Sequence, residues 1–320
     1  KPDQAIEKYE EASTIKPDMG AQLKTAYCYA LKENYAESVR WIDHFIPVAP
    51  SEGIRAMAYE FRGFYHSIQG SLSQALGDFG KAAELYESMN NFPYLGIMFL
   101  RRGWVCYDWG ANDLGRKFVQ ALYDHRDRDK IQSASSNEAL HQCYFGLLEL
   151  RENRLEEALS RLATAKSYLG KTTSPAETRA IARAYYFFSG ETLLAQGAAV
   201  EALAEFKRMP QTALNLSAPI TIILRNLPYA DDFAARALEK KGERDKAIAE
   251  YERLLDPKNT GNGLIHPFTR LRLAQLYERA GQRAKAMEQY EKVVAVWMVA
   301  EPGLPRVEQA RARLAALRAQ

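Results

Sequence analysis

Hydrophobic side chains recur at helical spacing along almost the whole chain, in pairs of short segments separated by a turn. Residues 268–296 show this most plainly, with one apolar stripe before Gly281 and a second after it. Each stripe contains a small residue, Ala274 in the first and Ala286 in the second. Two helices approach to roughly 8–10 Å only where nothing bulky stands between their backbones. We therefore predict a helical hairpin whose helices cross at these two alanines.

The same arrangement recurs with a fixed internal spacing. Small residues twelve apart form the pairs Ala26/Ser38, Gly63/Ala75, Gly103/Gly115, Gly146/Ala158, Gly190/Ala202, Ala235/Ala247 and Ala274/Ala286. Seven residues after the first member stands a residue that can end a helix in a left-handed turn, namely Gly70, Gly110, Asn153, Gly197, Gly242 or Gly281, with Glu33 as the exception. Four residues after the second member stands a bulky apolar residue: Ile42, Phe79, Val119, Leu162, Phe206, Tyr251 or Tyr290. The spacing predicts seven helical hairpins.

The order of small residue, turn glycine, alanine and aromatic residue resembles the tetratricopeptide repeat. This resemblance implies an all-α fold, a right-handed α-α superhelix or solenoid of helical hairpins. Small residues of successive second helices are separated by 33 residues (Ala5 to Ser38) to 45 residues (Ala202 to Ala247), so most units are longer than the family's shortest form. Such long units resemble arrays in bacterial regulators, both transcription activators and kinase-associated proteins, and residues 274–302 look most like the kinase-attached kind.

The expected organisation is a single solenoid over residues 1–320. Residues 1–17 form a partial repeat whose first helix is missing, about seven hairpins fill residues 19–300, and residues 304–320 form a capping helix. Val307, Ala310, Leu314 and Leu317 share one face of that last helix and can cover the end of the array. Because the chain starts with Lys1 in mid-repeat, we expect it to be part of a longer protein.

Composition narrows the possible partners. Hydrophobic residues at 47% and charged residues at 26% are ordinary for a globular protein, and a net charge of +3 gives no general attraction to nucleic acid or anionic lipid. No apolar run is long enough to span a bilayer. Cys28, Cys106 and Cys143 are odd in number and far apart, which disfavours both a disulfide framework and a zinc site. Unpaired thiols fit a reducing compartment, so a cytoplasmic location is expected.

Catalytic chemistry has no local support in the sequence. The motifs for phosphate-binding loops, dinucleotide binding, zinc hydrolysis and the nucleophile elbow are absent, and the five histidines lie in different repeats. We therefore predict no enzyme activity, no cofactor and no metal.

What remains is a binding surface. The family resemblance implies that the first helices of the hairpins line a concave face, where the residues predicted to bind a partner are Tyr27, Phe64, Arg101, Trp104, Tyr107, Leu147 and Phe187. Glu191 and Arg236 follow toward the C-terminal end and make that part charged. Aromatic residues are enriched at binding hot spots. The alternative is that Phe64, Trp104 and Tyr107 pack between helices and that Arg101 or Arg102 stands at a solvated helix face.

Two functions follow from this surface. The first is a non-catalytic scaffold that binds a peptide or partner protein in an aromatic-lined groove. The alternative is a ligand- or peptide-sensing regulatory domain of a larger signalling protein, such as a kinase or a transcription regulator. Nucleic acid is not expected as a partner because the charge is nearly balanced, and the oligomeric state is left open.

Overall fold

The structure is a computed structural model of the chain. It describes residues 2–15, 19–124, 134–172, 174–210, 220–227, 229–256 and 264–319. Within these ranges the chain forms helices joined by turns, and no strand occurs. The all-α prediction is confirmed. No helix among the described residues is long and apolar enough to cross a membrane.

The chain divides into two compact units. Unit 1 consists of Lys1–Met89, Ala213–Tyr229 and Ile248–Gln320, and unit 2 of Asn90–Thr212 and Ala230–Ala247. The helices of unit 1 are α1 (Pro2–Ile15), α2 (Met19–Leu31), α3 (Tyr35–Phe45), α4 (Glu52–Gln69), α5 (Leu72–Ser88), α12 (Ile220–Asn226), α15 (Pro267–Arg279), α16 (Arg283–Val296) and α17 (Pro305–Ala319), with short 3-10 helices η1 (Ile46–Val48) and η3 (Trp297–Val299). Those of unit 2 are α6 (Phe92–Trp109), α7 (Asn112–Asp124), α8 (Ala134–Arg151), α9 (Leu155–Lys166), α10 (Pro175–Ala195), α11 (Ala199–Arg208) and α13 (Phe233–Lys240), while α14 (Arg244–Leu255) contains the boundary.

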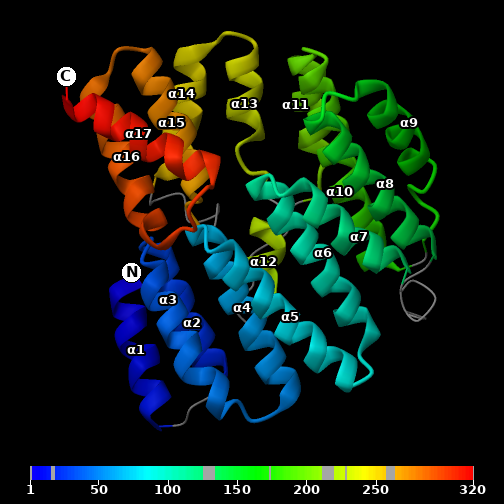
Figure 1. Cartoon of the computed structure of the whole chain (residues 1–320), viewed down its shortest axis with the longest axis vertical. Helices are drawn as coiled ribbons and strands as arrows, with labels where there is room; N and C mark the ends of the chain where they lie inside the picture. The colour runs from blue at the N-terminus through cyan, green and yellow to red at the C-terminus, as the bar shows by residue number, and fades with distance from the viewer. Residues whose placement is uncertain are drawn as a thin grey trace. The chain divides into compact units, whose positions relative to one another are not determined.

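Consecutive helices pack against each other as the predicted hairpins (Figure 1). The pairs that lie within one unit are α2 with α3, α4 with α5, α6 with α7, α8 with α9, α10 with α11, and α15 with α16. The fold is an all-α array of tetratricopeptide-like helical hairpins.

Each hairpin corner contains a residue in the left-handed conformation. The turn residues named from the sequence have φ between +59° and +81°: Gly70, Gly110, Asn153, Gly197, Gly242 and Gly281. Glu33, the apparent exception, is itself left-handed at φ +59°. The corner geometry is therefore the same in all seven hairpins, whatever residue occupies it.

Two of the paired small positions lie in direct contact across their hairpins, as predicted. Ser38 Oγ donates to the Ala26 carbonyl at 2.8 Å, directly across the hairpin of α2 and α3. A Cβ added to Gly63 would lie 3.0 Å from the Ala75 carbonyl oxygen. In both hairpins the backbones are too close for a larger side chain.

Some of the space beside the small residues is filled by the following hairpin. A Cβ on Gly103 would lie 2.6 Å from Val119 of its own hairpin and 3.3 Å from Tyr144 of the next one. A Cβ on Gly146 would lie 2.1 Å from the ring of Phe188, which also comes from the next hairpin. Small residues therefore serve contacts between hairpins as well as within them.

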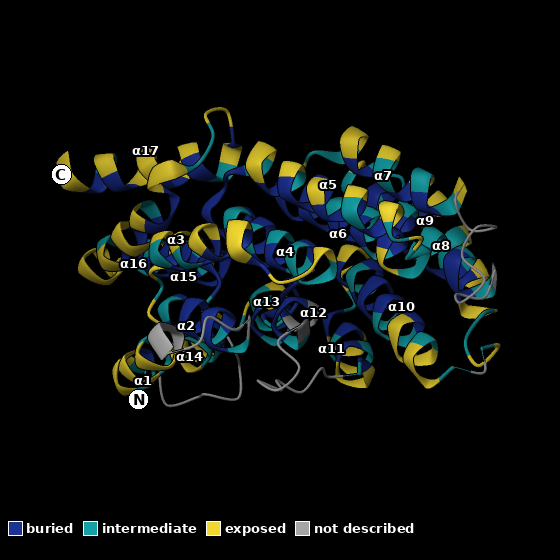
Figure 2. Cartoon of the chain, turned by 90° about the horizontal axis from the view of Figure 1, so that it is seen from below, coloured by how far each residue is buried: buried dark blue, intermediate teal, exposed yellow. Residues whose placement is uncertain are grey.

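Helix α17 covers α16 at the C-terminal end of the chain. Val307, Ala310, Leu314 and Leu317 are buried, as the sequence indicates, while the opposite face of the helix is exposed (Figure 2). At the other end α1 packs on α2, and Lys1, Lys16 and Pro17 of the predicted partial repeat lie outside the described residues.

Helices from both ends of the chain pack together in unit 1. Tyr35 Oη donates to the Ile265 carbonyl at 2.9 Å, across 230 residues of sequence. The guanidinium of Arg270, on α15, forms an ion pair with Glu33 at the α2–α3 corner. A single continuous solenoid over residues 1–320 stays a prediction.

Candidate partner-binding surface

Four aromatic residues of unit 2 form a cluster on the first helices of three successive hairpins. They are Trp104 and Tyr107 on α6, Tyr144 on α8 and Phe187 on α10. The ring of Trp104 lies 5.8 Å from Tyr107, 5.2 Å from Tyr144 and 6.4 Å from Phe187, each in a T-shaped arrangement. Edge-to-face pairs at these distances stabilise packing beyond the area they bury.

The local sequence brings these rings together. Trp104 and Tyr107 are three residues apart on a helix and so share one face. The Tyr144 ring reaches the α6–α7 hairpin because Gly103 and Gly115 leave room for it, and its hydroxyl donates to the Gly103 carbonyl at 2.5 Å. The cluster therefore depends on glycines of one hairpin and aromatic residues of the next.

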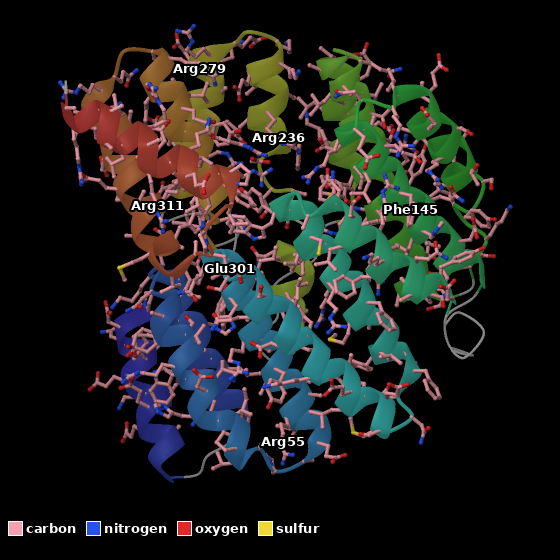
Figure 3. The ribbon with its side chains drawn as sticks, viewed as in Figure 1. Arg55, Phe145, Arg236, Arg279, Glu301 and Arg311 are labelled. Carbon is pink, nitrogen blue, oxygen red and sulfur yellow. The ribbon has the colours of Figure 1, made fainter. Side chains whose placement is uncertain are left out.

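Charged side chains border the cluster. The Arg151 guanidinium lies 3.5 Å from the centre of the Tyr107 ring and donates to the Tyr107 carbonyl at the end of α6. Figure 3 labels Arg236 on α13. Arg236 donates to both carboxylate oxygens of Glu191, one at 2.9 Å, and to Asp232 at 3.0 Å. Arg151, Glu191 and Arg236 are half-buried, whereas the rings of the cluster are buried.

Burial controls the protonation of the cluster. Burial raises the pKa of the Tyr107 and Tyr144 hydroxyls, so both remain neutral at physiological pH. Burial also lowers the pKa of Arg101 to about 9.

All seven residues predicted to bind a partner are buried. Trp104, Tyr107 and Phe187 lie together in the cluster, and Leu147 lies on α8 with no exposed surface. Tyr27 and Phe64 belong to unit 1, where the Phe64 ring lies 5.5 Å from that of Tyr65. Even Tyr107, the most exposed of the seven, is only 7% exposed, so in this structure their side chains serve as packing. Their role in partner binding stays a prediction.

Arg101 is 5% exposed, so the solvated helix face considered for it is wrong. The reason is its position two residues before the small residue Gly103. The same position holds Phe61 before Gly63, Tyr144 before Gly146 and Phe188 before Gly190, and all three are fully buried. Tyr144 and Phe188 contact the preceding hairpin from this position, whereas Lys24, Phe233 and Arg272, which hold it in three other hairpins, are half-buried.

Sequence reasoning missed Tyr144 and Arg151. Tyr144 could have been found, because an aromatic residue two positions before the small residue recurs in Phe61 and Phe188. Arg151 offered no such signal, since its contact with Tyr107 joins two hairpins across 44 residues.

The described ranges contain no assembled metal site, and their cysteines are not paired. No group of three or more His, Cys, Asp or Glu residues there could hold a metal ion. Cys28, Cys106 and Cys143 are free and buried, and burial raises the pKa of Cys106 to about 12. A thiol with so high a pKa is a poor nucleophile.

Comparison with known proteins gives structural neighbours only. No protein-family model matches the chain, and no curated protein matches it. A tetratricopeptide repeat protein from Parabacteroides merdae is 12% identical and covers 98% of this chain and 99% of its own, with a TM-score of 0.45. A Rap protein complexed with competence and sporulation factor is 15% identical over 99% of this chain and 93% of its own, with a TM-score of 0.47.

A third neighbour is a chain of the APC/C hetero-tetramer Cut9–Hcn1, 12% identical over 97% of this chain and 52% of that one, with a TM-score of 0.42. Similarities this weak carry no argument about function. The fold stands on the hairpin spacing, the left-handed corners and the small-residue contacts described above.

Proposed function

We propose that this chain is a non-catalytic scaffold that binds a peptide or a segment of a partner protein on unit 2. The proposed surface, called the rim here, consists of Arg151, Glu191 and Arg236 around the aromatic cluster. The observation that supports it is the placement of half-buried charges beside aromatic rings contributed by three hairpins. Aromatic residues and arginine are the residue types enriched in protein interfaces.

The rim carries both positive and negative side chains that a peptide can pair with. Within the described part of the chain no carboxylate pairs with Arg151, whose contacts are the ring and the carbonyl of Tyr107. An acidic group on a bound peptide would find a cation there. Glu191 and Arg236 already satisfy each other, so they can exchange partners with a peptide without leaving a buried charge alone.

The test is selection of binding peptides followed by rim substitutions. Peptides are selected from a phage-displayed library on the intact chain, and their dissociation constants are measured by fluorescence polarisation. Arg151→Ala and Arg236→Ala should each weaken binding by about tenfold or more, as expected for loss of a hydrogen bond to a charged group. Arg40→Ala is the control, because Arg40 is exposed and its ion pair among the described residues is with its helix neighbour Glu37. Equal affinities for all four proteins would refute the rim.

Trp104→Ala tests whether the cluster is packing or surface. Because Trp104 is 6% exposed and touches three other rings, truncation should destabilise unit 2 by about 3–5 kcal/mol. Urea unfolding followed by circular dichroism measures this. If the variant keeps wild-type stability, Trp104 is not a core residue and becomes the best candidate for the groove wall.

A regulatory role is the second candidate. In unit 1 the last hairpin is held on the first hairpins by polar contacts such as that between Arg270 and Glu33, which a ligand could compete with. A bacterial regulator or kinase-associated context, and a cytoplasmic location with three free thiols, belong to the same proposal.

A further inference from the structure

A short segment after the last hairpin docks on the corner between α4 and α5, inside unit 1. Residues 297–301 supply one side of the contact and residues 68–73 the other. The hydrogen bonds run from Trp297 Nε1 to the Ile68 carbonyl at 3.1 Å, from Ser71 Oγ to the Val299 carbonyl at 3.1 Å, from the Glu301 N–H to the Gly70 carbonyl at 3.1 Å, and from the Ser73 N–H to the Glu301 carboxylate. Figure 3 shows Glu301 at the end of α4.

The docked segment satisfies groups that the two helices leave open. The last carbonyls of a helix and the first N–H groups of the next have no partners within their own helices. Ile68 and Gly70 carry such carbonyls at the end of α4, and Ser73 carries such an N–H at the start of α5. The segment therefore binds backbone groups of the corner, which any helix–turn–helix sequence would offer.

Glu301 takes the place of a helix cap. Ser71 is the N-cap residue of α5, yet its hydroxyl makes no cap hydrogen bond to its own helix and donates to Val299 instead. The Glu301 carboxylate accepts from the first turn of α5 in its stead. A negative charge at a helix N-terminus is stabilised by the helix dipole as well as by the hydrogen bond.

The middle of the segment contributes little side-chain packing. Met298 is 76% exposed and Val299 53% exposed, whereas Trp297 is fully buried. The segment is thus anchored by the indole at one end and the carboxylate at the other, with backbone bonds between them. A bound peptide is held in the same way, by two side-chain anchors and its main chain.

We propose that the α4–α5 corner is a peptide-docking site, which residues 297–301 occupy within the same chain. Its ligand is a short segment with an indole N–H donor followed four residues later by a carboxylate. A partner that carries the same two groups would compete with the chain's own segment and release it. This site lies in unit 1 and does not depend on the rim of unit 2.

The first test removes the carboxylate anchor. Glu301→Ala should raise hydrogen exchange of the Ser73 amide and of the neighbouring amides at the start of α5 by about tenfold, because their acceptor is lost. Glu291→Ala is the control, since Glu291 is a half-exposed carboxylate whose ion pair in the described part of the chain is with Arg318. Unchanged exchange at the start of α5 in Glu301→Ala would overturn the anchor and with it the site.

The second test supplies the segment as a separate peptide. A fluorescent peptide of residues 295–303 is titrated into the full chain carrying Trp297→Ala and Glu301→Ala, which vacate both anchors. Saturable binding is expected, at least tenfold weaker both for a peptide carrying Glu301→Gln and for the wild-type chain, whose site is filled. A folded double variant that does not bind, or equal binding by the wild-type chain, would overturn the proposal. If the double variant does not fold, the exchange measurement decides.

Discussion

Gly146→Ala should destabilise unit 2, although alanine is the better helix former. Gly146 lies within α8, and an added Cβ would stand 2.1, 2.6 and 2.8 Å from three atoms of the Phe188 ring. Phe188 is fully buried, so its ring cannot swing into solvent to make room. The methyl group can be accommodated only if α8 and α10 move apart.

The magnitude follows from two opposing terms. Replacing glycine by alanine inside a helix stabilises by about 1 kcal/mol, because glycine loses more backbone entropy on folding. Overpacking a filled core costs about 1–3 kcal/mol, and three contacts below 3 Å place this case at the upper end. The net loss should be about 1–2 kcal/mol.

Gly77→Ala is the matched control. Gly77 also lies inside a helix, α5, but an added Cβ there meets no atom within 4 Å. It should stabilise unit 1 by about 0.5–1 kcal/mol. Both variants are measured by urea unfolding with circular dichroism and intrinsic fluorescence. Gly146→Ala at or above wild-type stability would refute the packing argument, as would a destabilised Gly77→Ala.

A double-mutant cycle then assigns the clash to its partner. Phe188→Leu removes ring atoms from the space beside Gly146, so Gly146→Ala should cost about 1 kcal/mol less in that background. Purely additive effects would mean that the strain arises elsewhere in α8.

Two further predictions concern the corners and pH. Glu33→Gly should destabilise unit 1 by about 1–3 kcal/mol in urea unfolding, because loss of the Arg270 ion pair outweighs relief of the left-handed backbone. Asn153→Gly is the control, since Asn153 has the same φ of +59° and an exposed side chain. It should be neutral or stabilising in the same measurement. Burial and the nearby Arg306 charge lower the pKa of His266 to about 3. Below pH 6.5, His266 is therefore protonated in the unfolded chain but stays neutral in the folded chain. Stability should therefore fall by about 1.4 kcal/mol per pH unit, or about 2 kcal/mol from pH 6.5 to pH 5. His266→Gln should flatten this slope in pH-dependent urea unfolding and the exposed control His44→Gln should not; equal slopes would contradict the assignment.

The hairpins were predictable from sequence because each is local. The twelve-residue spacing of Gly63 and Ala75, and the glycine seven residues after Gly63, are fixed by the geometry of one hairpin alone. A small residue lets the two helices of a hairpin approach closely, and a left-handed corner turns the chain back between them. This is why the element types and corners agree with the structure.

The exposure of the candidate surface was not predictable in the same way. Whether Trp104 faces a groove or a neighbouring ring depends on how closely α6, α8 and α10 approach one another. Phe187, two hairpins further along the chain, lies 6.4 Å from Trp104, a distance that no periodicity within α6 encodes. A residue type enriched at binding surfaces is also one that fills a core, so composition alone could not separate the two.

Glu33 shows how a contact distant in sequence can override a local rule. A left-handed conformation costs a non-glycine residue about 1–2 kcal/mol, so local reasoning marks glutamate as out of place at this corner. The structure gives the compensation: Arg270, 237 residues later, donates to the Glu33 carboxylate and also to Gln289 at 2.7 Å. The Arg270 side chain is only 7% exposed, and leaving such a buried cation without its carboxylate costs about 3–5 kcal/mol, which exceeds the conformational cost at Glu33. Glutamate is therefore favoured at this corner because the last hairpin packs on the first. The left-handed conformation of Glu33 is compensated by that long-range contact.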